Sequence, residues 1–307
     1  MATNRPGDRT QRERAESQAT IAAIAAFIVV ALVIGLWMWG ERLPLAGRDV
    51  DSFGTRAAWI SGGAAGLAFA AAFVSASSSG EGSWRRRLPL FKRIIDAIVL
   101  TVAFAAVSAL SVEAVANLFQ RGFVGLTIDA LGGAALAGAS GAFLAYLASV
   151  FGSRVTTANL AALATLVIFI GTLASMLTSP DDRWWEFHFS QLGNQEGTSA
   201  AAFNGALILT GLTITAFADY AARDAHRGMS LRGVSSDGTS RSGGAGGWWS
   251  LERRRGAVSW MLIVIGVCMM VAGLVHDAMN KTVHVGAASG MVVVFGLLAA
   301  FSLTMMP

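Results

Sequence analysis

Eight apolar runs constrain the fold of this chain more than any other feature of its sequence. Each run is about 20 residues long, the length at which a helix spans the ~30 Å hydrocarbon core of a bilayer. Because lipid offers the backbone no hydrogen bonds, only helices or closed barrels can cross it. The runs lack the alternation of a barrel strand, which leaves an all-α, polytopic transmembrane helical bundle. They cover residues 20–40, 57–76, 94–116, 130–152, 158–178, 199–218, 257–275 and 284–305.

The basic residues between the runs predict the orientation of the chain. With the amino terminus inside, the inner segments hold 17 of the 23 Lys and Arg residues and the outer segments hold 6. This asymmetry follows the positive-inside rule. We therefore expect both termini to be cytoplasmic and the protein to lie in the plasma membrane of a bacterium. Topology also accounts for the net charge of +4, so no nucleic-acid partner is needed to explain it.

The polar segments suggest how the chain is divided. Residues 1–19 are predicted to be a disordered cytoplasmic tail, followed by a four-helix half over 20–153 and a second half over 154–307. A Gly- and Ser-rich stretch within 221–256 predicts a flexible cytoplasmic linker. The single cysteine, Cys268, lies inside an apolar run, so no intramolecular disulfide can form.

The segment 180–205 is the most chemically varied part of the chain. It contains Trp185, Glu186, His188 and Ser190, and it leads to Asn204 inside the next run. A buried asparagine needs a hydrogen-bonding partner, and the turn at 190–193 is the one we expect. Ser190 with His188 as its base could form a nucleophilic pair, but no G-x-S-x-G elbow surrounds it. A serine in a turn is the simpler interpretation.

Three of the four histidines map to the outer side of the membrane. His276 and His284 flank the last outer turn, Asp277 follows His276, and His188 lies in the long loop. We expect these groups to approach one another, since ionisable residues at a membrane edge are functional candidates. Imidazole and carboxylate groups are zinc ligands, but no metal-spaced pair appears. A hydrogen-bonded polar cap is the alternative, and a haem is less favoured because all three histidines lie at one edge. The sequence names no cofactor.

Small residues recur at four-residue spacing in several runs, and they predict close helix packing. Gly62 and Gly66 lie in the second run, Gly286 and Gly290 in the last, and the stretch 132–142 is rich in Gly and Ala. Helical phase also places Asn204, Gly211 and Thr215 on one face, and a matching face carries Ser259, Gly266, Gly273 and His276. The expected partners are membrane lipids, and a protein partner or a second copy could use the small-residue faces.

The second half resembles a known family. Ser190-x-Leu192-Gly193, then Phe203-Asn204 opening a helix, and later His284 followed by Ala287-Ala288, are similar to the bacterial domain-of-unknown-function family 998. The resemblance covers roughly residues 158–305 and implies a multi-pass inner-membrane protein without an assigned activity. Two features depart from the family. Its members continue with further helices where this sequence ends at Pro307, and they carry a proline where this chain has Val275-His276-Asp277.

Two classes of function remain open at this stage. The first is a membrane protein that binds a lipid or a partner at a polar site on its extracytoplasmic face, for which the residues are Trp185, Glu186, His188, Ser190, Asn204, His276, Asp277 and His284. The second is a metal- or acid/base-assisted hydrolase of lipid headgroups, with His188, His276 and His284 as candidate metal ligands. The binding role needs only a shaped polar mouth with aromatic edges, and it is the one we favour.

Overall fold

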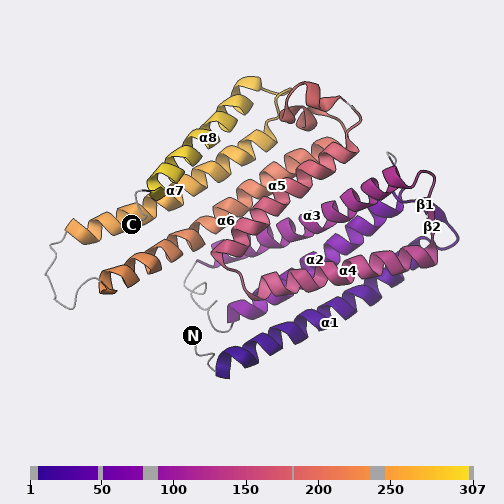
Figure 1. Cartoon of the computed structure of the whole chain (residues 1–307), viewed down its shortest axis with the longest axis horizontal. Coiled ribbons are helices and arrows are strands. Elements are labelled where there is room, and N and C mark those ends of the chain that lie inside the picture. Colours follow the sequence, from indigo (N-terminus) through magenta and orange to yellow (C-terminus); the bar gives the residue numbers. More distant parts are fainter. Residues whose placement is uncertain (1–5, 48–50, 79–88, 182, 236–245, 304–307) are drawn as a thin grey trace. The chain divides into compact units, whose positions relative to one another are not determined.

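The computed structural model describes residues 6–47, 51–78, 89–181, 183–235 and 246–303 (Figure 1). Within these residues, eight helices are long and apolar enough to cross a membrane, which confirms the predicted all-α bundle. The helices are α1 (Pro6–Trp37), α2 (Phe53–Ser78), α3 (Leu90–Gly122), α4 (Ala130–Ser153), α5 (Thr157–Thr178), α6 (Thr198–Ser235), α7 (Gly246–Leu274) and α8 (Lys281–Leu303). Below, "outer" denotes the helix ends that the charge pattern assigns to the outside.

Short elements join these helices at their outer ends. Strand β1 (Arg42–Pro44) follows α1, and strand β2 (Thr127–Asp129) precedes α4. The two strands pair antiparallel, with Arg42 opposite Asp129. Two 3-10 helices, η2 (Trp184–Glu186) and η3 (Phe189–Asn194), lie between α5 and α6. The sequence analysis did not predict the strand pair, because three residues per strand are too few to show an alternation.

The chain forms two compact units whose boundary passes through α5 and α6. The first contains residues 1–155 and 166–203, and the second contains 156–165 and 204–307. The predicted boundary near Arg154 therefore holds for the first four helices only. The outer part of α5, the following loop and the start of α6 belong with the first unit. The predicted halves divided the chain by sequence position, whereas packing groups the outer end of α5 with α3.

In the first unit, α2 lies between α3 and α4, and α4 also packs against α1. Glycines allow these contacts. A Cβ on Gly62 would come 2.8 Å from the carbonyl oxygen of Ala105, and one on Gly141 would come 2.8 Å from Cγ2 of Val30. The predicted small-residue seams are thus used inside the chain. Larger apolar side chains fill the outer end of the unit, among them Ile34, Met38 and Phe53.

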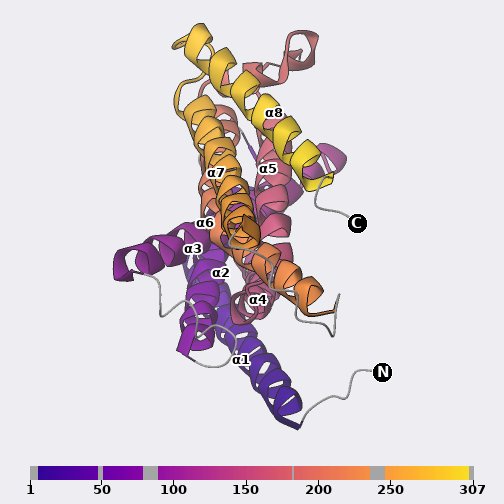
Figure 2. The ribbon, with the colours of Figure 1, turned by 90° about the vertical axis from the view of Figure 1, so that its left-hand side faces the viewer.

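In the second unit, α6 meets α7, and α7 lies beside α8, as Figure 2 also shows. A Cβ on Gly211 would come 2.4 Å from the carbonyl oxygen of Gly266, and one on Gly273 would come 2.8 Å from that of Asn204. The side-chain oxygen of Thr215 lies against Gly266. The two faces predicted from helical phase therefore meet each other. Gly286 of α8 has open space beside it, so that glycine serves no contact within the described residues.

Two predictions of disorder were wrong for the residues that the structure describes. Helix α1 begins at Pro6, so residues 6–19 are helical rather than a disordered tail. Helix α6 continues to Ser235 and α7 begins at Gly246, so most of the predicted linker is helical. Residues 1–5 and 236–245 lie outside the described residues. Ala, Arg, Glu and Gln favour the helix, and an existing transmembrane helix removes the cost of nucleating a new one.

Candidate functional site

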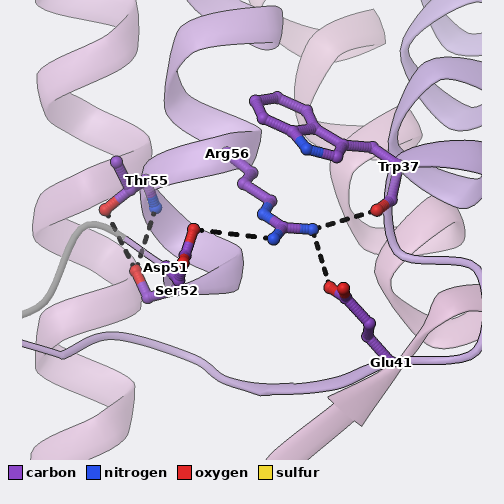
Figure 3. Close-up of polar contacts among 6 residues, drawn as sticks. All are labelled: Trp37, Glu41, Asp51, Ser52, Thr55 and Arg56. Atoms are coloured by element: carbon purple, nitrogen blue, oxygen red, sulfur yellow. Dashed lines mark hydrogen bonds and ion pairs between the residues drawn. The ribbon is translucent and has the colours of Figure 1, made fainter.

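The outer end of α1 is held by Arg56 from the first turns of α2 (Figure 3). Its Nη1 donates to the carbonyl oxygen of Trp37, the last residue of α1, at 3.0 Å, and to Oε2 of Glu41, also at 3.0 Å. The guanidinium also stacks on the Trp37 ring, 5.0 Å from its centre. A helix end leaves carbonyls without partners, and a cation is favoured there by the helix dipole. Arg56 therefore caps α1.

The start of α2 determines where Arg56 lies. Ser52 precedes the helix, and its hydroxyl accepts a hydrogen bond from the backbone N–H of Thr55 at 3.2 Å, the bond of a helix N-cap. The hydroxyls of Ser52 and Thr55 lie 3.0 Å apart. The backbone N–H of Gly54 donates to the carbonyl oxygen of Leu45, which ties the helix start to the preceding loop. Together these bonds orient the guanidinium toward the end of α1.

Arg56 is buried, whereas the two carboxylates that pair with it are exposed. Arg56 is only 8% exposed, whereas the side chains of Glu41 and Asp51 are 50% and 81% exposed. Asp51 is 3.6 Å from Nη2, an ion-pair distance that is too long for a hydrogen bond. The buried Nε has no hydrogen-bond partner among the described residues. One cation thus faces two carboxylates, and one edge of the guanidinium is incompletely bonded.

A second polar cluster lies between α2 and α3. The side-chain nitrogen of Asn117 donates to the Glu113 carboxylate at 3.2 Å and to the backbone oxygen of Glu113 at 2.9 Å. The Thr55 side chain is a further hydrogen-bonding neighbour of that carboxylate. The shared face of Glu113 and Asn117 follows from their four-residue spacing. Asp129 accepts from the backbone of Gly132 and caps α4, so it is a structural residue.

The loop over residues 179–197, called the aromatic loop here, presents apolar rings to the surroundings. Trp185, Phe187 and Phe189 are 62%, 69% and 58% exposed. The ring of Trp184 meets those of Trp185 and Phe189 edge-on, with centroids 6.1 and 5.7 Å away. Among the described residues, the Glu186 side chain forms a long 4.0 Å ion pair with Arg183 at the surface. Trp185 and Phe189 therefore form one cluster with Trp184, and Phe187 is a further exposed ring of the same loop.

The base of the aromatic loop is fixed to the first unit. The buried hydroxyls of Ser175 in α5 and Ser199 in α6 lie 3.0 Å apart, and Ser199 also donates to the Ser175 carbonyl. Leu192 is fully buried. Arg121 at the end of α3 donates to the carbonyl oxygen of Leu177 at 2.7 Å and so caps α5. The rings are thus exposed from a loop whose two ends are held in place.

His188 and Ser190 meet within the aromatic loop. The Ser190 hydroxyl lies 2.8 Å from Nδ1 of His188, so the predicted pair is within hydrogen-bonding distance. Both residues belong to one turn, and His188 is exposed. No third side chain among the described residues orients the imidazole. The pair can move a proton between nitrogen and oxygen.

His284 has a different role, as a cap within the second unit. Its Nδ1 lies 3.0 Å from the carbonyl oxygens of Ala272 and Val275, and since carbonyls only accept, Nδ1 carries the proton. The ring is buried and satisfies the end of α7. Asn280 caps the start of α8 by accepting from the backbone of Val283 at 3.1 Å. His284 therefore acts as a helix cap through Nδ1, and the choice between a polar cap and a metal site stays a prediction.

The predicted site residues are divided between the two units. Trp185, Glu186, His188 and Ser190 are in the first, and Asn204, His276, Asp277 and His284 are in the second. A common site for all three histidines stays a prediction. In the described part of the chain, no three His, Cys, Asp or Glu side chains are grouped as metal ligands. His276 contributes through its backbone, whose oxygen accepts from Met279 and Asn280.

Sequence reasoning missed the role of Arg56, Glu41 and Asp51. The available signal was a lone arginine at the start of an apolar run, since an arginine at a membrane edge is costly unless it is paired. In the charge pattern, Arg56 counts only as one of the outer basic residues. The same holds for Arg121. Two of the six outer basic residues are thus helix caps.

No family model, curated protein or solved structure matches the chain. The resemblance to domain-of-unknown-function family 998 therefore stays a prediction, and the class of protein is defined by the fold: a multi-pass helical membrane protein.

Proposed function

We propose that this protein is a non-enzymatic multi-pass protein of the bacterial plasma membrane that binds a lipid or a protein partner at its outer face. The observation that carries the proposal is the aromatic loop, whose exposed rings Trp185, Phe187 and Phe189 stand on a fixed base. Aromatic residues are enriched at membrane interfaces and at binding surfaces. A loop that is ordered before binding loses less conformational entropy on association.

The remaining polar groups support binding rather than catalysis. Arg56 and His284, two buried groups that could take part in chemistry, are engaged in capping α1 and α7. Catalysis needs groups held at fixed geometry around a reacting atom. His188 and Ser190 do lie within hydrogen-bonding distance of each other, and they carry the alternative function considered below.

The test is site-specific photocrosslinking in native membranes. A benzophenone amino acid at Phe187 is expected to crosslink strongly, whereas the same probe at Val124, which is 91% exposed in another outer loop, is the matched control. Lipid adducts would identify a lipid ligand, and a discrete protein adduct would identify a partner. Equal crosslinking at both positions would contradict the proposal.

The second candidate is the acid/base-assisted lipid hydrolase, and the 2.8 Å contact between Ser190 and His188 favours it. A fluorophosphonate probe reacts with activated serines and distinguishes the two functions. The binding proposal expects no labelling of the purified protein. Labelling that is lost in Ser190→Ala, together with release of a headgroup from added phospholipid, would replace the binding proposal with the enzyme.

A further inference from the structure

Glu113 is a half-buried acid inside the membrane span of α3, and its side-chain partners are neutral. Asn117 donates to its carboxylate at 3.2 Å, and the Thr55 side chain of α2 is the second hydrogen-bonding neighbour. Glu113 forms no ion pair with any residue that the structure describes. A charged side chain within a membrane is costly unless it is paired, so this carboxylate lacks a cation.

The helices around this part of α3 are almost free of charge. Helix α3 has no other charged residue between Asp96 and Arg121. Ala114 of α3 packs against α5 and the start of α6, and neither α5 nor residues 198–218 contain an Asp, Glu, Lys or Arg. The same holds for α4, whose cap Asp129 is an acid, and α2 contains one charged residue, Arg56. Only two arginines could therefore pair with the carboxyl from these helices.

Both arginines have other partners. The guanidinium of Arg56 is bonded to the end of α1 and pairs with Glu41 and Asp51, which already supply two negative charges. Arg121 lies about two turns further along α3, where it donates to the carbonyl oxygen of Leu177. The cation that the carboxyl lacks must therefore come from the surroundings.

A proton is the cation that fits this arrangement. A metal ion such as Ca²⁺ or Mg²⁺ needs a shell of several oxygen ligands, whereas a proton needs one carboxyl oxygen and no cavity beside it. Uptake of one proton forms an O–H bond on the carboxylate and leaves a neutral acid, and release returns the proton to water. The neutral acid removes the cost of an unpaired charge in the membrane.

Hydroxyl groups at the start of α2 suit both forms of the carboxyl. The Thr55 hydroxyl adjoins Glu113, and it lies 3.0 Å from the hydroxyl of the fully buried Ser52 (Figure 3). A hydroxyl donates one hydrogen bond and can also accept. Thr55 therefore donates to the ionised carboxylate and accepts from the neutral acid, and Ser52 complements it in each case. The carboxyl can gain or lose a proton without a change of hydrogen-bonding partners.

We propose that Glu113 is a proton-binding site within the membrane. Its protonation sets the direction of the hydrogen bonds through Thr55 to Ser52, and so it is sensed at the outer start of α2. The site is separate from the aromatic loop, and it holds whether that loop binds a lipid or a protein.

The test is infrared spectroscopy of the full chain in lipid nanodiscs at pH 6.5, where a solvent-exposed glutamate has lost its proton. The wild type is expected to show the carbonyl band of a neutral carboxylic acid, and Glu113→Gln should lack it. Glutamine keeps an oxygen that accepts from Asn117, so this variant preserves the local packing. Raising the pH should abolish the band in the wild type. Absence of the band at pH 6.5, or an equal band in both proteins, would overturn the proposal.

Two further variants separate this site from other acids and from a structural role. Asp96 is also buried in α3, but it pairs with Lys92 at 3.4 Å, so Asp96→Asn should leave the band unchanged. Thr55→Val keeps the side-chain shape but removes a donor to the carboxylate, so the neutral acid should persist to a pH about one unit higher. Loss of the band in Asp96→Asn would overturn the assignment to Glu113, and an unchanged pH profile in Thr55→Val would overturn the coupling to α2.

Discussion

The outer ends of α1 and α7 have the same deficiency and are completed in different ways. Both helices end with carbonyls that have no partner within the helix. Arg56 caps α1 with a charged guanidinium, which brings with it Glu41, Asp51 and the ring of Trp37. His284 caps α7 with a single imidazole N–H shared by two carbonyl oxygens.

The difference teaches what each cap requires from its surroundings. A buried charge must be paired, so the arginine cap needs a group of counter-charges that reaches into solvent. The imidazole donates without needing a counter-charge, so it fits between two helices. The arginine cap consequently leaves a charged, half-exposed cluster, while the histidine cap leaves none.

The largest expected effect comes from removing the arginine cap. Arg56→Ala loses a charge-assisted hydrogen bond to Trp37 and the stacking on its ring, and we expect a loss of about 3 kcal/mol in the free energy of unfolding. Glu41 and Asp51 add little, because water rehydrates them. Thermal unfolding in detergent measures it. Arg183→Ala, in the aromatic loop, is the control, and an equal effect from both would contradict the capping role.

Removing the histidine cap should cost less. In His284→Ala, the carbonyls of Ala272 and Val275 lose their shared donor, for a loss of about 1–2 kcal/mol. The same unfolding assay applies, with His276→Ala as the matched control, since no hydrogen bond of its side chain is found within the described residues. An effect of His276→Ala as large as that of His284→Ala would contradict the proposed division of roles.

The counter-charge of the arginine cap can be tested by itself. Glu41→Gln keeps an oxygen acceptor for Nη1 but removes the charge, and we expect a loss of about 0.5–1 kcal/mol because the carboxylate is half exposed. In 1 M salt, the free energy of unfolding of the wild type should fall toward that of Glu41→Gln, because the ion pair is screened. The variant, which lacks the ion pair, should not show this fall. A stability that does not respond to salt in either protein would show that the pair contributes nothing.

The smallest effect is expected at α5. Arg121→Ala removes the donor to the Leu177 carbonyl, but the site is exposed and water replaces it, so the loss should be about 0.5 kcal/mol. Hydrogen exchange of the amides in residues 183–197 is the more sensitive measurement. Faster exchange there would show that this cap also steadies the aromatic loop, and unchanged exchange would limit its role to α5.

Much of the fold could be predicted from the sequence, because bilayer thickness imposes a length on each apolar run. The eight spans, the shared face of Glu113 and Asn117, and the separate faces that carry Gly211 and Gly266 all follow from helix length or helix periodicity. The helical state of residues 6–19 could not be predicted in this way, because a polar composition fits both a disordered tail and a continuation of the membrane helix. Of the candidate site, the sequence indicated the aromatic loop but not the arginine cap of α1.

What the sequence determined by itself is therefore the set of membrane spans and the faces along each helix, since both depend on positions that are close in the chain. Only the tertiary structure decided which polar side chain serves which helix end. Arg56 lies 19 residues from Trp37, and Arg121 lies 56 residues from Leu177. No local pattern links such positions. Their meeting depends on how helices pack, and that packing is what separates a capping arginine from one counted only as an outer charge.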